Sequence, residues 1–194
     1  MRKVKGDAVI TKRQIMEAAF DCFYNKGFDS TTLEEVAKNA NLTRGAVYWH
    51  FKDKVDLYRQ VVYDSYRYTD IVTFGKSLSE ELSLKDRLLE IFMFVQSEYR
   101  QFMFIYKTIA FVSQSSDFAD LMEDMRRKKI DLLNYFTNLA ENYKSELRDP
   151  RRSASDIGSA LFLMFEGLFL VENLSLKMPM SRKDIARYIE LIIS

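Results

Sequence analysis

The hydrophobic residues near the start of the chain recur at the spacing of an amphipathic helix. Ile15, Ala19 and Phe23 are separated by four residues each, so they lie on one face of a helix predicted over residues 11–26. Gly27 follows directly and is a typical residue for ending a helix. This apolar face needs partners from the segment that comes next.

Two short helices separated by a tight turn are predicted in that segment. Thr32 and Glu35 have the spacing of a capping box and open the first of them. Asn41 can adopt the left-handed backbone conformation of a turn, and Thr43 can cap a further helix over residues 44–50. Two short helices joined by such a turn form a helix-turn-helix, whose second helix enters the major groove of DNA.

Longer, apolar-rich helical patterns fill the rest of the chain. A fourth helix is predicted from Asp53 to about Thr73, and five more follow beyond Gly75. Their expected ranges are 84–100, 101–112, 117–147, 154–176 and 182–193. The pattern predicts an all-α protein of about nine helices. We divide it into a helix-turn-helix domain, a connecting helix and a second helical domain, at residues 1–52, 53–74 and 75–194.

Composition narrows the class of protein. A chain of 194 residues, 47% of them hydrophobic, can bury a sizeable core. The single cysteine, Cys22, cannot form an intramolecular disulfide, and no signal-peptide pattern is present. The longest apolar stretch, residues 160–171, contains Glu166 and is shorter than a bilayer span. We therefore expect a cytoplasmic protein with no membrane partner.

The charged residues are unevenly distributed. The net charge is only +1, yet the chain up to Arg59 carries eleven basic against eight acidic side chains. A modest positive bias at one end suits a module that faces phosphates, attached to a nearly neutral body.

The sequence lacks the residue patterns of an enzyme. It has one histidine, no nucleophile-elbow motif, no Gly-rich phosphate loop, and no Cys or His spacing suited to a metal. We expect no catalytic residue, no metal and no cofactor. Cys22 falls on the apolar face of the first helix, so a buried, unreactive thiol is expected there.

The run from Thr31 to Leu57, TTLEEVAKNANLTRGAVYWHFKDKVDL, closely resembles the DNA-binding region of the tetracycline-repressor (TetR) family. The resemblance extends back to Ile15 and covers about the first third of the chain. The wording TRGAVYWHF at 43–51 is most similar to the branch that represses multidrug efflux pumps. Asn41 stands where the family usually has glycine, and asparagine is the next most tolerant residue for a positive φ.

Candidate DNA contacts lie on and around the third helix. Arg44, at the start of that helix, can form a bidentate pair with guanine O6 and N7, so we expect it to read a base; a solvated surface arginine is the alternative. Gly45 has no side chain and lets the helix approach the duplex closely. Tyr48 and His50 resemble the family's phosphate-contacting residues, although His50 can equally interact with the dipole of its own helix. The complete expected set is Thr31, Thr32, Thr43, Arg44, Gly45, Tyr48, Trp49, His50 and Lys54.

Four members of that set lie at helix starts. Thr43 can cap the third helix and also bond a phosphate. Lys54, in the first turn of the fourth helix, can hold a phosphate together with the backbone amides. Thr31 and Thr32 can do the same at the second helix through their hydroxyls and amides, and the alternative for Thr32 is a cap alone.

The C-terminal two-thirds match the family in length and architecture only. Their Phe, Tyr and Met side chains indicate either a plain core or a promiscuous apolar pocket for a small effector. The candidate pocket residues are Phe92, Tyr99, Phe102, Phe104, Tyr106, Phe111, Met125 and Glu166. A carboxylate in an apolar helix needs a partner, so Glu166 is expected to meet a cationic ligand, a basic side chain or a dimer mate.

The resemblance implies a homodimer formed by the last long helices. The candidate interface residues are Gly158, Leu161, Phe165, Leu168, Phe169 and Glu172, and burial within one chain is the alternative for them. The expected function is a ligand-responsive repressor that binds a palindromic operator and is released by an apolar or amphipathic effector. The expected partners are operator double-stranded DNA, a second copy and that effector. The alternatives are an activator, a ligand-independent regulator, or a helical protein-interaction adaptor.

Overall fold

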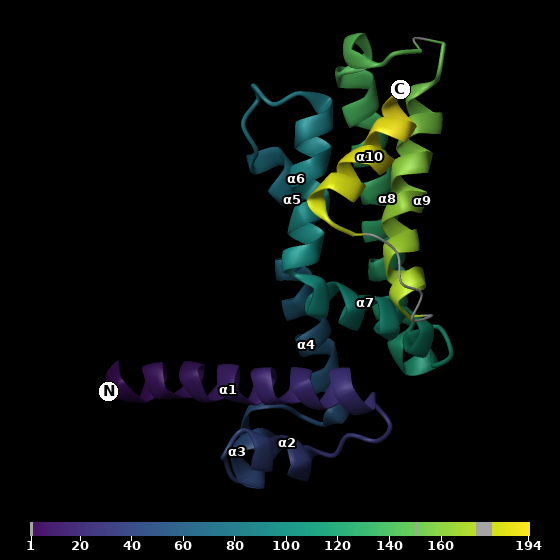
Figure 1. The fold of residues 1–194 in the computed structure, drawn as a ribbon. Helices are drawn as coiled ribbons and strands as arrows, with labels where there is room; N and C mark the ends of the chain where they lie inside the picture. The colour runs from purple at the N-terminus through teal and green to yellow at the C-terminus, as the bar shows by residue number, and fades with distance from the viewer. Residues whose placement is uncertain (1, 150, 174–179) are drawn as a thin grey trace. The chain divides into compact units, whose positions relative to one another are not determined.

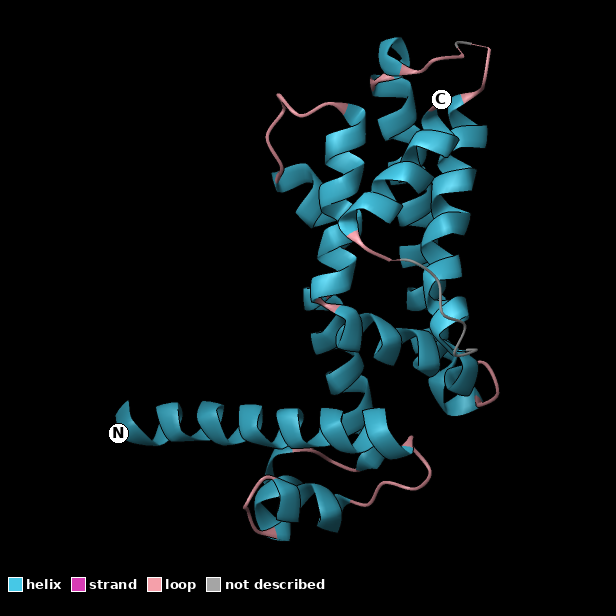
Figure 2. Cartoon of the chain, viewed as in Figure 1, coloured by secondary structure: helices cyan, strands magenta, loops and turns pink. Residues whose placement is uncertain are grey.

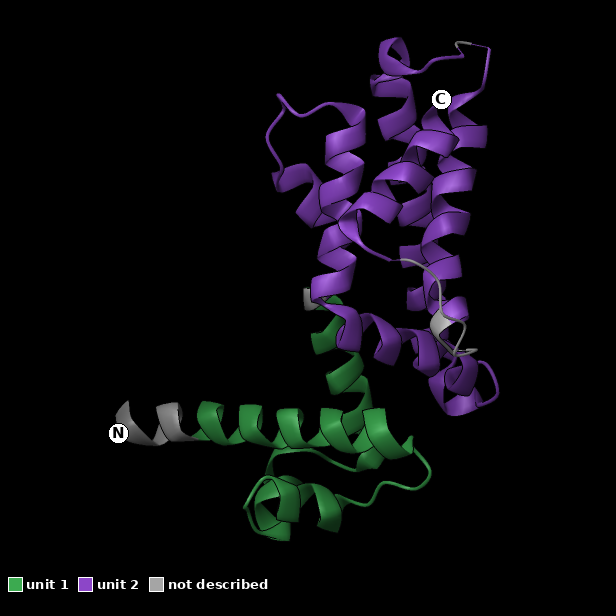
Figure 3. Ribbon diagram, viewed as in Figure 1, with its two compact units in different colours: residues 1–67 green, residues 68–194 purple. Residues whose placement is uncertain are grey.

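The computed structural model describes the backbone of residues 2–149, 151–173 and 180–194. Within these ranges every regular element is a helix, with ten α-helices and two short 3₁₀ helices (Figures 1 and 2). The predicted all-α fold is therefore confirmed. The chain divides into two compact units, Met1–Arg67 and Tyr68–Ser194 (Figure 3).

The first unit holds the four helices nearest the N-terminus. They are α1 (Arg2–Lys26), α2 (Leu33–Asn39), α3 (Arg44–His50) and α4 (Lys54–Tyr68). Helix α1 begins earlier than the predicted residue 11, whereas the bounds of α3 agree with the prediction. The residues that bury the common core are Ile15, Ala19, Cys22, Phe23, Val36, Val47, Phe51 and Leu57.

The start of α4 packs into the first unit. The ring of Tyr58 lies edge-on to Phe23, with centroids 4.9 Å apart, and 5.1 Å from Phe28. These contacts explain why the boundary between the units falls after Arg67, near the end of α4, whereas our division ended the first domain at residue 52. The predicted connecting helix thus lies mostly inside the first unit.

Polar side chains define the short helices as the sequence predicted. The Thr32 hydroxyl accepts a hydrogen bond from the Glu35 amide at 3.2 Å and begins α2. Asn41 takes the left-handed conformation, with φ of +55°, and turns the chain between α2 and α3. The Thr43 hydroxyl then accepts a hydrogen bond from the Ala46 amide at 3.2 Å and begins α3.

The prediction of a single fourth helix that runs to about residue 73 is wrong, because the structure has two helices in this segment. Helix α4 ends at Tyr68, and α5 spans Ile71–Ser77. Asp70 causes the new start: its carboxylate accepts hydrogen bonds from the Thr73 amide at 2.9 Å and the Thr73 hydroxyl at 2.8 Å. An aspartate that makes these capping bonds favours a new helix start over a position inside one longer helix.

The second unit contains the remaining helices. They are α5, α6 (Leu84–Ser97), α7 (Tyr99–Val112), η1 (Ser116–Phe118), α8 (Ala119–Asn142), η2 (Lys144–Glu146), α9 (Ala154–Asn173) and α10 (Arg182–Ile193). Helices α8 and α9 run side by side, and α10 returns to α6 (Figure 1). The predicted continuation of the ninth helix to residue 176 lies outside the described residues.

The close packing of α8 and α9 depends on a glycine. A Cβ built on Gly158 would lie 2.3 Å from Thr137 Oγ1 and 2.7 Å from Thr137 Cα, so only glycine fits there. On the same helix, Leu161, Phe165 and Phe169 are buried, together with Phe136 of α8. These residues form the core of the second unit.

A buried arginine ties α5 to α6. Arg87 of α6 is 6% exposed, and its Nη1 donates a hydrogen bond to the Gly75 carbonyl at 2.8 Å. Its Nη2 donates to the Ser79 carbonyl at 2.6 Å, and its Nε donates to the Tyr143 hydroxyl at 3.0 Å. The three bonds satisfy much of the guanidinium in the interior, where an unpaired charge is costly.

Candidate nucleic-acid interface

Helix α3 presents most of its side chains to solvent. Only Val47 points into the core of the first unit, where it is fully buried and joined by Phe51 just after the helix. Tyr48 is exposed, and Trp49 has 72% of its surface accessible. An indole this exposed is unusual in a monomeric protein, because burial of an aromatic ring is strongly favourable. The helix therefore offers a large aromatic surface to a partner.

Arg44 is held at the start of α3 by two neighbours. Its Nη2 donates a hydrogen bond to the Tyr48 hydroxyl at 3.1 Å, and the guanidinium lies 5.1 Å from the centroid of the Tyr48 ring. Its Nη1 lies 2.6 Å from Oε1 of Glu34 on α2. The hydrogen bond to Tyr48 and the charge of Glu34 raise the pKa of Arg44 above its ordinary value. The arginine is a fixed cation on an exposed surface.

The aromatic side chains at the end of α3 pack edge to face. The rings of Trp49 and His50 are perpendicular, with centroids 4.4 Å apart. Partial burial, aided by the nearby charge of Lys12, lowers the pKa of His50 below 6.5. His50 is therefore predominantly neutral at pH 7, which weakens its attraction to a phosphate.

Gly45 is exposed, and the protein interior does not require it. The nearest heavy atom to a Cβ built there is Thr43 Oγ1 at 3.8 Å, an ordinary van der Waals distance. Glycine reduces helix stability relative to alanine. Packing within the first unit therefore does not account for a glycine in the first turn of α3, and its close approach to DNA stays a prediction.

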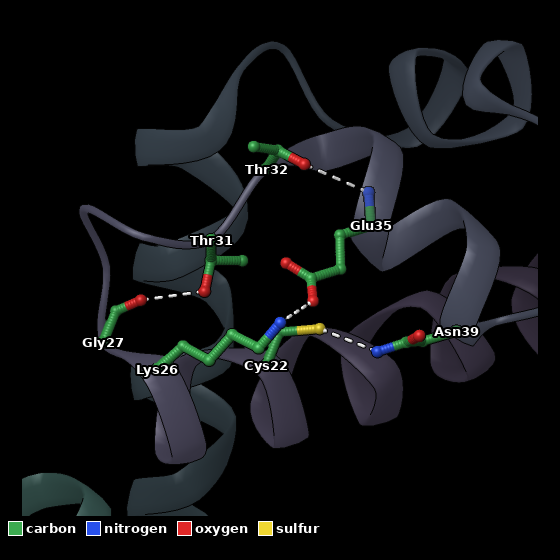
Figure 4. A network of polar contacts seen from close by, with 7 residues as sticks. All are labelled: Cys22, Lys26, Gly27, Thr31, Thr32, Glu35 and Asn39. Atoms are coloured by element: carbon green, nitrogen blue, oxygen red, sulfur yellow. Dashed lines mark hydrogen bonds and ion pairs between the residues drawn. The ribbon is translucent and has the colours of Figure 1, made fainter.

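The two threonines before α2 have different positions (Figure 4). Thr32 is exposed at the helix start and caps it, as expected. Thr31 is fully buried, and its hydroxyl donates a hydrogen bond to the Gly27 carbonyl at 2.8 Å. The expected phosphate contact of the Thr31 side chain does not fit this position, because no surface of Thr31 is accessible. Its hydroxyl instead fixes the loop between α1 and α2.

The same region contains two further polar links between α1 and α2, shown in Figure 4. The Glu35 carboxylate pairs with Lys26 rather than turning back to the amide of the capping residue Thr32. Asn39 Nδ2 donates to the Cys22 sulfur at 3.2 Å. Burial raises the pKa of the Cys22 thiol, which fits the expected unreactive thiol.

Lys54 also has a place inside the first unit. Its Nζ donates hydrogen bonds to the carbonyls of Phe28 at 2.8 Å and Asp29 at 3.3 Å. The ammonium also lies 4.3 Å from the centroid of the Phe28 ring. The position differs from the expected phosphate contact, because the ammonium is already engaged by the α1–α2 loop.

Glu34 is the member of this surface that the sequence analysis missed. It lies ten positions before Arg44, and nothing in the periodicity of either short helix links the two. Only the folded turn at Asn41 brings the start of α2 to the start of α3. The pairing of Glu34 with Arg44 could not be predicted from the sequence, because it depends on how α2 and α3 are placed in the fold.

The candidate effector residues divide between several contacts in the second unit. Phe102 lies 5.9 Å from Phe165 and 5.7 Å from Phe169, measured between ring centroids, and Tyr106 also stacks on Phe169. Other candidates have separate partners: Phe92 faces Phe136, and Phe111 faces Phe118. Phe92, Phe104 and Met125 are buried, and Tyr99 is half-buried.

Glu166 has a partner within the chain. Its carboxylate pairs with Lys129 of α8, and both side chains are 28% exposed. The Lys129 ammonium also lies 5.4 Å from the centroid of the Phe165 ring. A basic side chain, one of the three partners expected for Glu166, is thus present within the chain.

Most of the candidate dimer residues lie inside the second unit. Gly158, Leu161, Phe165 and Phe169 are buried in one chain, so our assignment of these four to a partner surface does not fit their positions. Leu168 is half-buried, and the side chain of Glu172 lies outside the described residues. The large exposed hydrophobic side chains of α8 and α9 are instead Ile130, Leu163 and Leu170.

Helix α9 is also the one described helix that is long and apolar enough to cross a membrane, judged by length and composition alone. The qualifying window is Ala154–Val171, longer than the apolar stretch identified from the sequence. A core helix of a soluble protein passes the same test.

Among the described residues, no group of three or more His, Cys, Asp or Glu side chains is placed to hold a metal ion.

The capped α3, its inward Val47 and its exposed arginine and aromatic residues define a helix-turn-helix DNA-binding domain. Residues 15–61 match the family model described as bacterial regulatory proteins, tetR family. This segment is therefore a tetR-type DNA-binding domain, and the curated relatives that share it are transcriptional regulators.

Curated relatives resemble the chain over the same region. The HTH-type transcriptional regulator AcrR of Shigella flexneri is 48% identical over 60 residues, which are 31% of this chain and 28% of that protein. The HTH-type transcriptional regulator TtgR of Pseudomonas putida is 33% identical over 96 residues, 47% of this chain and 46% of that protein. The matches thus span less than half the length of these relatives.

Solved structures resemble the chain over nearly its whole length. NalD, the secondary repressor of the MexAB-OprM multidrug efflux pump in Pseudomonas aeruginosa, aligns with a TM-score of 0.63 at 22% identity, covering 96% of this chain and 95% of that one. The regulatory protein TetR from Rhodobacter sphaeroides aligns with a TM-score of 0.72 at 15% identity, covering 94% and 98%. At these identities the likeness establishes the shared fold of both units.

Proposed function

We propose that this protein is a transcriptional repressor of the cytoplasm that binds a palindromic operator as a homodimer and inserts α3 into the major groove. The observation that carries the proposal is the exposed face of α3, which carries Arg44, Tyr48 and Trp49 and has a glycine in the first turn of the helix. Such a face has a size and chemistry suited to base edges and phosphates.

In this proposal the residues of α3 have separate roles. Arg44 reads a guanine through O6 and N7, a contact that contributes about 1 to 3 kcal/mol of discrimination. Gly45 allows the helix backbone to approach the duplex, and Thr43, Tyr48 and Trp49 contact the sugar-phosphate backbone. Thr32, exposed at the start of α2, is a further phosphate contact through its hydroxyl and its backbone amide.

The proposed homodimer forms through α8 and α9. Ile130, Leu163 and Leu170 are exposed on these two helices, and a second copy related by a two-fold axis would cover them. A two-fold dimer presents its two recognition helices symmetrically, so its operator is a near-palindrome with half-sites about one helical turn apart or a multiple of it.

The proposed effector is an apolar or amphipathic small molecule bound in the second unit beside Phe102, Tyr106 and Phe169. Met and aromatic side chains adapt to ligands of varied shape. Because Glu166 is already paired with Lys129, a cationic ligand has to compete with that lysine, and a neutral or anionic compound does not.

Selection of DNA fragments from a random pool by the purified protein tests the DNA-binding part. The expected result is one enriched sequence with inverted symmetry, whose affinity falls linearly in log K against log salt. Arg44→Ala is expected to relax the preference at one base pair of each half-site. A helical protein-interaction adaptor, the rival from another class, would enrich no sequence. Transcription from a promoter carrying the selected site then separates a repressor from an activator.

Sedimentation equilibrium tests the dimer with a matched pair of variants. Leu163→Glu is expected to give a monomer, because it places a carboxylate on the proposed apolar interface. Leu191→Glu is the control, since Leu191 on α10 is 70% exposed and Leu163 is 68% exposed. If both variants sediment as the wild type does, the interface lies elsewhere.

Release of operator DNA by compounds tests the effector. Neutral, anionic and cationic amphipathic compounds are titrated into the protein–DNA complex, with Phe102→Ala as the variant expected to lose the response. By linkage, a compound that weakens DNA binding tenfold must bind the DNA complex tenfold more weakly, a coupling of about 1.4 kcal/mol. Binding of every compound without any change in DNA affinity would remove the sensor from the proposal.

A further inference from the structure

The exposed surface of the helix-turn-helix contains an acidic side chain where DNA would bring phosphates. Glu34, in the first turn of α2, pairs with Arg44 at 2.6 Å, and both side chains are more than half exposed. Arg44 also donates to Tyr48 at 3.1 Å. Each terminal nitrogen of the guanidinium therefore has a partner before any DNA arrives.

Binding to DNA changes the partners of this guanidinium. A backbone phosphate brings its negative charge close to the Glu34 carboxylate, and the repulsion opposes the new contact. A guanine edge presents two neutral acceptors, O6 and N7, to the guanidinium fork. The guanine contact thus avoids the charge repulsion that the phosphate contact incurs, because its acceptors carry no net charge.

We propose that Glu34 is a positioning residue for sequence discrimination: it keeps Arg44 from binding phosphates of arbitrary DNA and leaves it available for a guanine edge. The inference rests on the proposed function of α3 in the major groove. Glu34 acts through Arg44, so its effect on binding is greater for random DNA than for the operator. The carboxylate lowers non-specific affinity, which sets the background against which a regulator must find its site.

The energetics of exposed ion pairs fit this role better than a structural one. A pair as exposed as this contributes little to the stability of the fold. It nonetheless changes the charge that Arg44 presents to DNA, because the cation is neutralised unless the pair opens. Glu34 also lies at the start of α2, where a negative charge interacts favourably with the helix dipole, and this second role would appear as a change in melting temperature.

The test compares Glu34→Gln with the wild type on the selected operator and on random duplex of equal length. Exposed ion pairs of this kind correspond to about a two- to fivefold change in equilibrium constant. We therefore expect random-DNA affinity to rise about two- to fivefold, operator affinity to change less, and the salt slope on random DNA to steepen by about one.

Two further variants make the result specific. Glu17→Gln is the charge control, because Glu17 on α1 is also exposed and also pairs with an arginine, Arg13, at 2.9 Å. Glu34→Gln in an Arg44→Ala background closes a double-mutant cycle. If Glu34 acts through Arg44, its substitution has no effect on random DNA in that background.

The outcomes separate this inference from the proposed function. A larger rise on random DNA than on operator, absent in the Arg44→Ala background and absent for Glu17→Gln, supports it. An equal change on both DNAs, a similar change for Glu17→Gln, or a change that persists without Arg44 overturns it while operator binding stands. If the wild type selects no operator at all, the proposed function itself fails.

Discussion

The ammonium of Lys54 donates a hydrogen bond to the carbonyl oxygen of Phe28 at 2.8 Å and lies over the ring of the same residue. The two residues are 26 positions apart, and they join the start of α4 to the loop between α1 and α2. Lys54 thereby stabilises the loop that leads into α2 and α3. This position leads to a prediction that differs from that for a simple phosphate contact.

Lys54→Ala is expected to destabilise the first unit by about 1 to 2 kcal/mol, because it removes charge-assisted hydrogen bonds to two carbonyls. Thermal unfolding measures the loss. Lys52→Ala is the control, since it removes the same charge from an exposed side chain two positions earlier. If Lys54 binds a phosphate instead, its substitution leaves the melting temperature unchanged and lowers the salt slope of DNA binding by about one.

Gly45→Ala is expected to separate stability from DNA binding. The added methyl group finds ordinary space, with Thr43 Oγ1 at 3.8 Å, and alanine is the better helix former by up to about 1 kcal/mol. The variant is therefore expected to melt at the same temperature as the wild type or higher. Operator affinity is expected to fall, because the methyl group separates α3 from the duplex. Unchanged affinity for the operator would show that the helix start does not approach the DNA closely.

Gly158→Ala is expected to destabilise the second unit by about 1 to 3 kcal/mol, because its methyl group would overlap the backbone of Thr137. Gly167→Ala on the same helix is the matched control, since no heavy atom lies within 4 Å of the added Cβ. The control is expected to be neutral or slightly stabilising. Chemical denaturation at fixed protein concentration distinguishes the two, and equal effects would show that α8 and α9 separate at this point.

The lowered pKa of His50 predicts a pH dependence of stability. The folded state binds a proton less readily than the unfolded state, whose pKa is close to 6.5. The contribution of His50 to stability is therefore complete above 6.5 and is lost as the pH falls through 6.5 toward the lower folded value. His50→Gln removes this contribution, so the wild type is expected to lose more melting temperature than the variant on acidification. Parallel curves for the two proteins would contradict the assignment.

The parts of the fold that could be predicted are those set by local chemistry. Asn41 in its left-handed turn and Thr43 at its helix start were both readable, because each acts on residues within three positions. Asp70 had the same local chemistry, but the apolar pattern on both sides of it indicated one continuous helix. The prediction gave more weight to the apolar pattern, whereas in the structure the Asp70 cap begins a separate helix.

The parts that could not be predicted depend on contacts between distant residues. Thr31 and Lys54 both have residue types that suit phosphates, and only the folded loop shows that they bond to Gly27 and Phe28. Likewise Glu166 left three partners open until α8 was placed beside it with Lys129. The periodicity of apolar residues distinguishes buried from exposed positions. It does not distinguish residues buried within one chain from residues buried against a second copy.

The buried sulfur of Cys22 makes the chain a reporter of its own local opening. It is the sole thiol of the protein, it belongs to the core of the first unit, and it accepts a hydrogen bond from Asn39. A thiol reagent can react with it only when α1 and α2 come apart. The labelling rate therefore measures local opening of the first unit alone, even while the helices of the second unit stay folded.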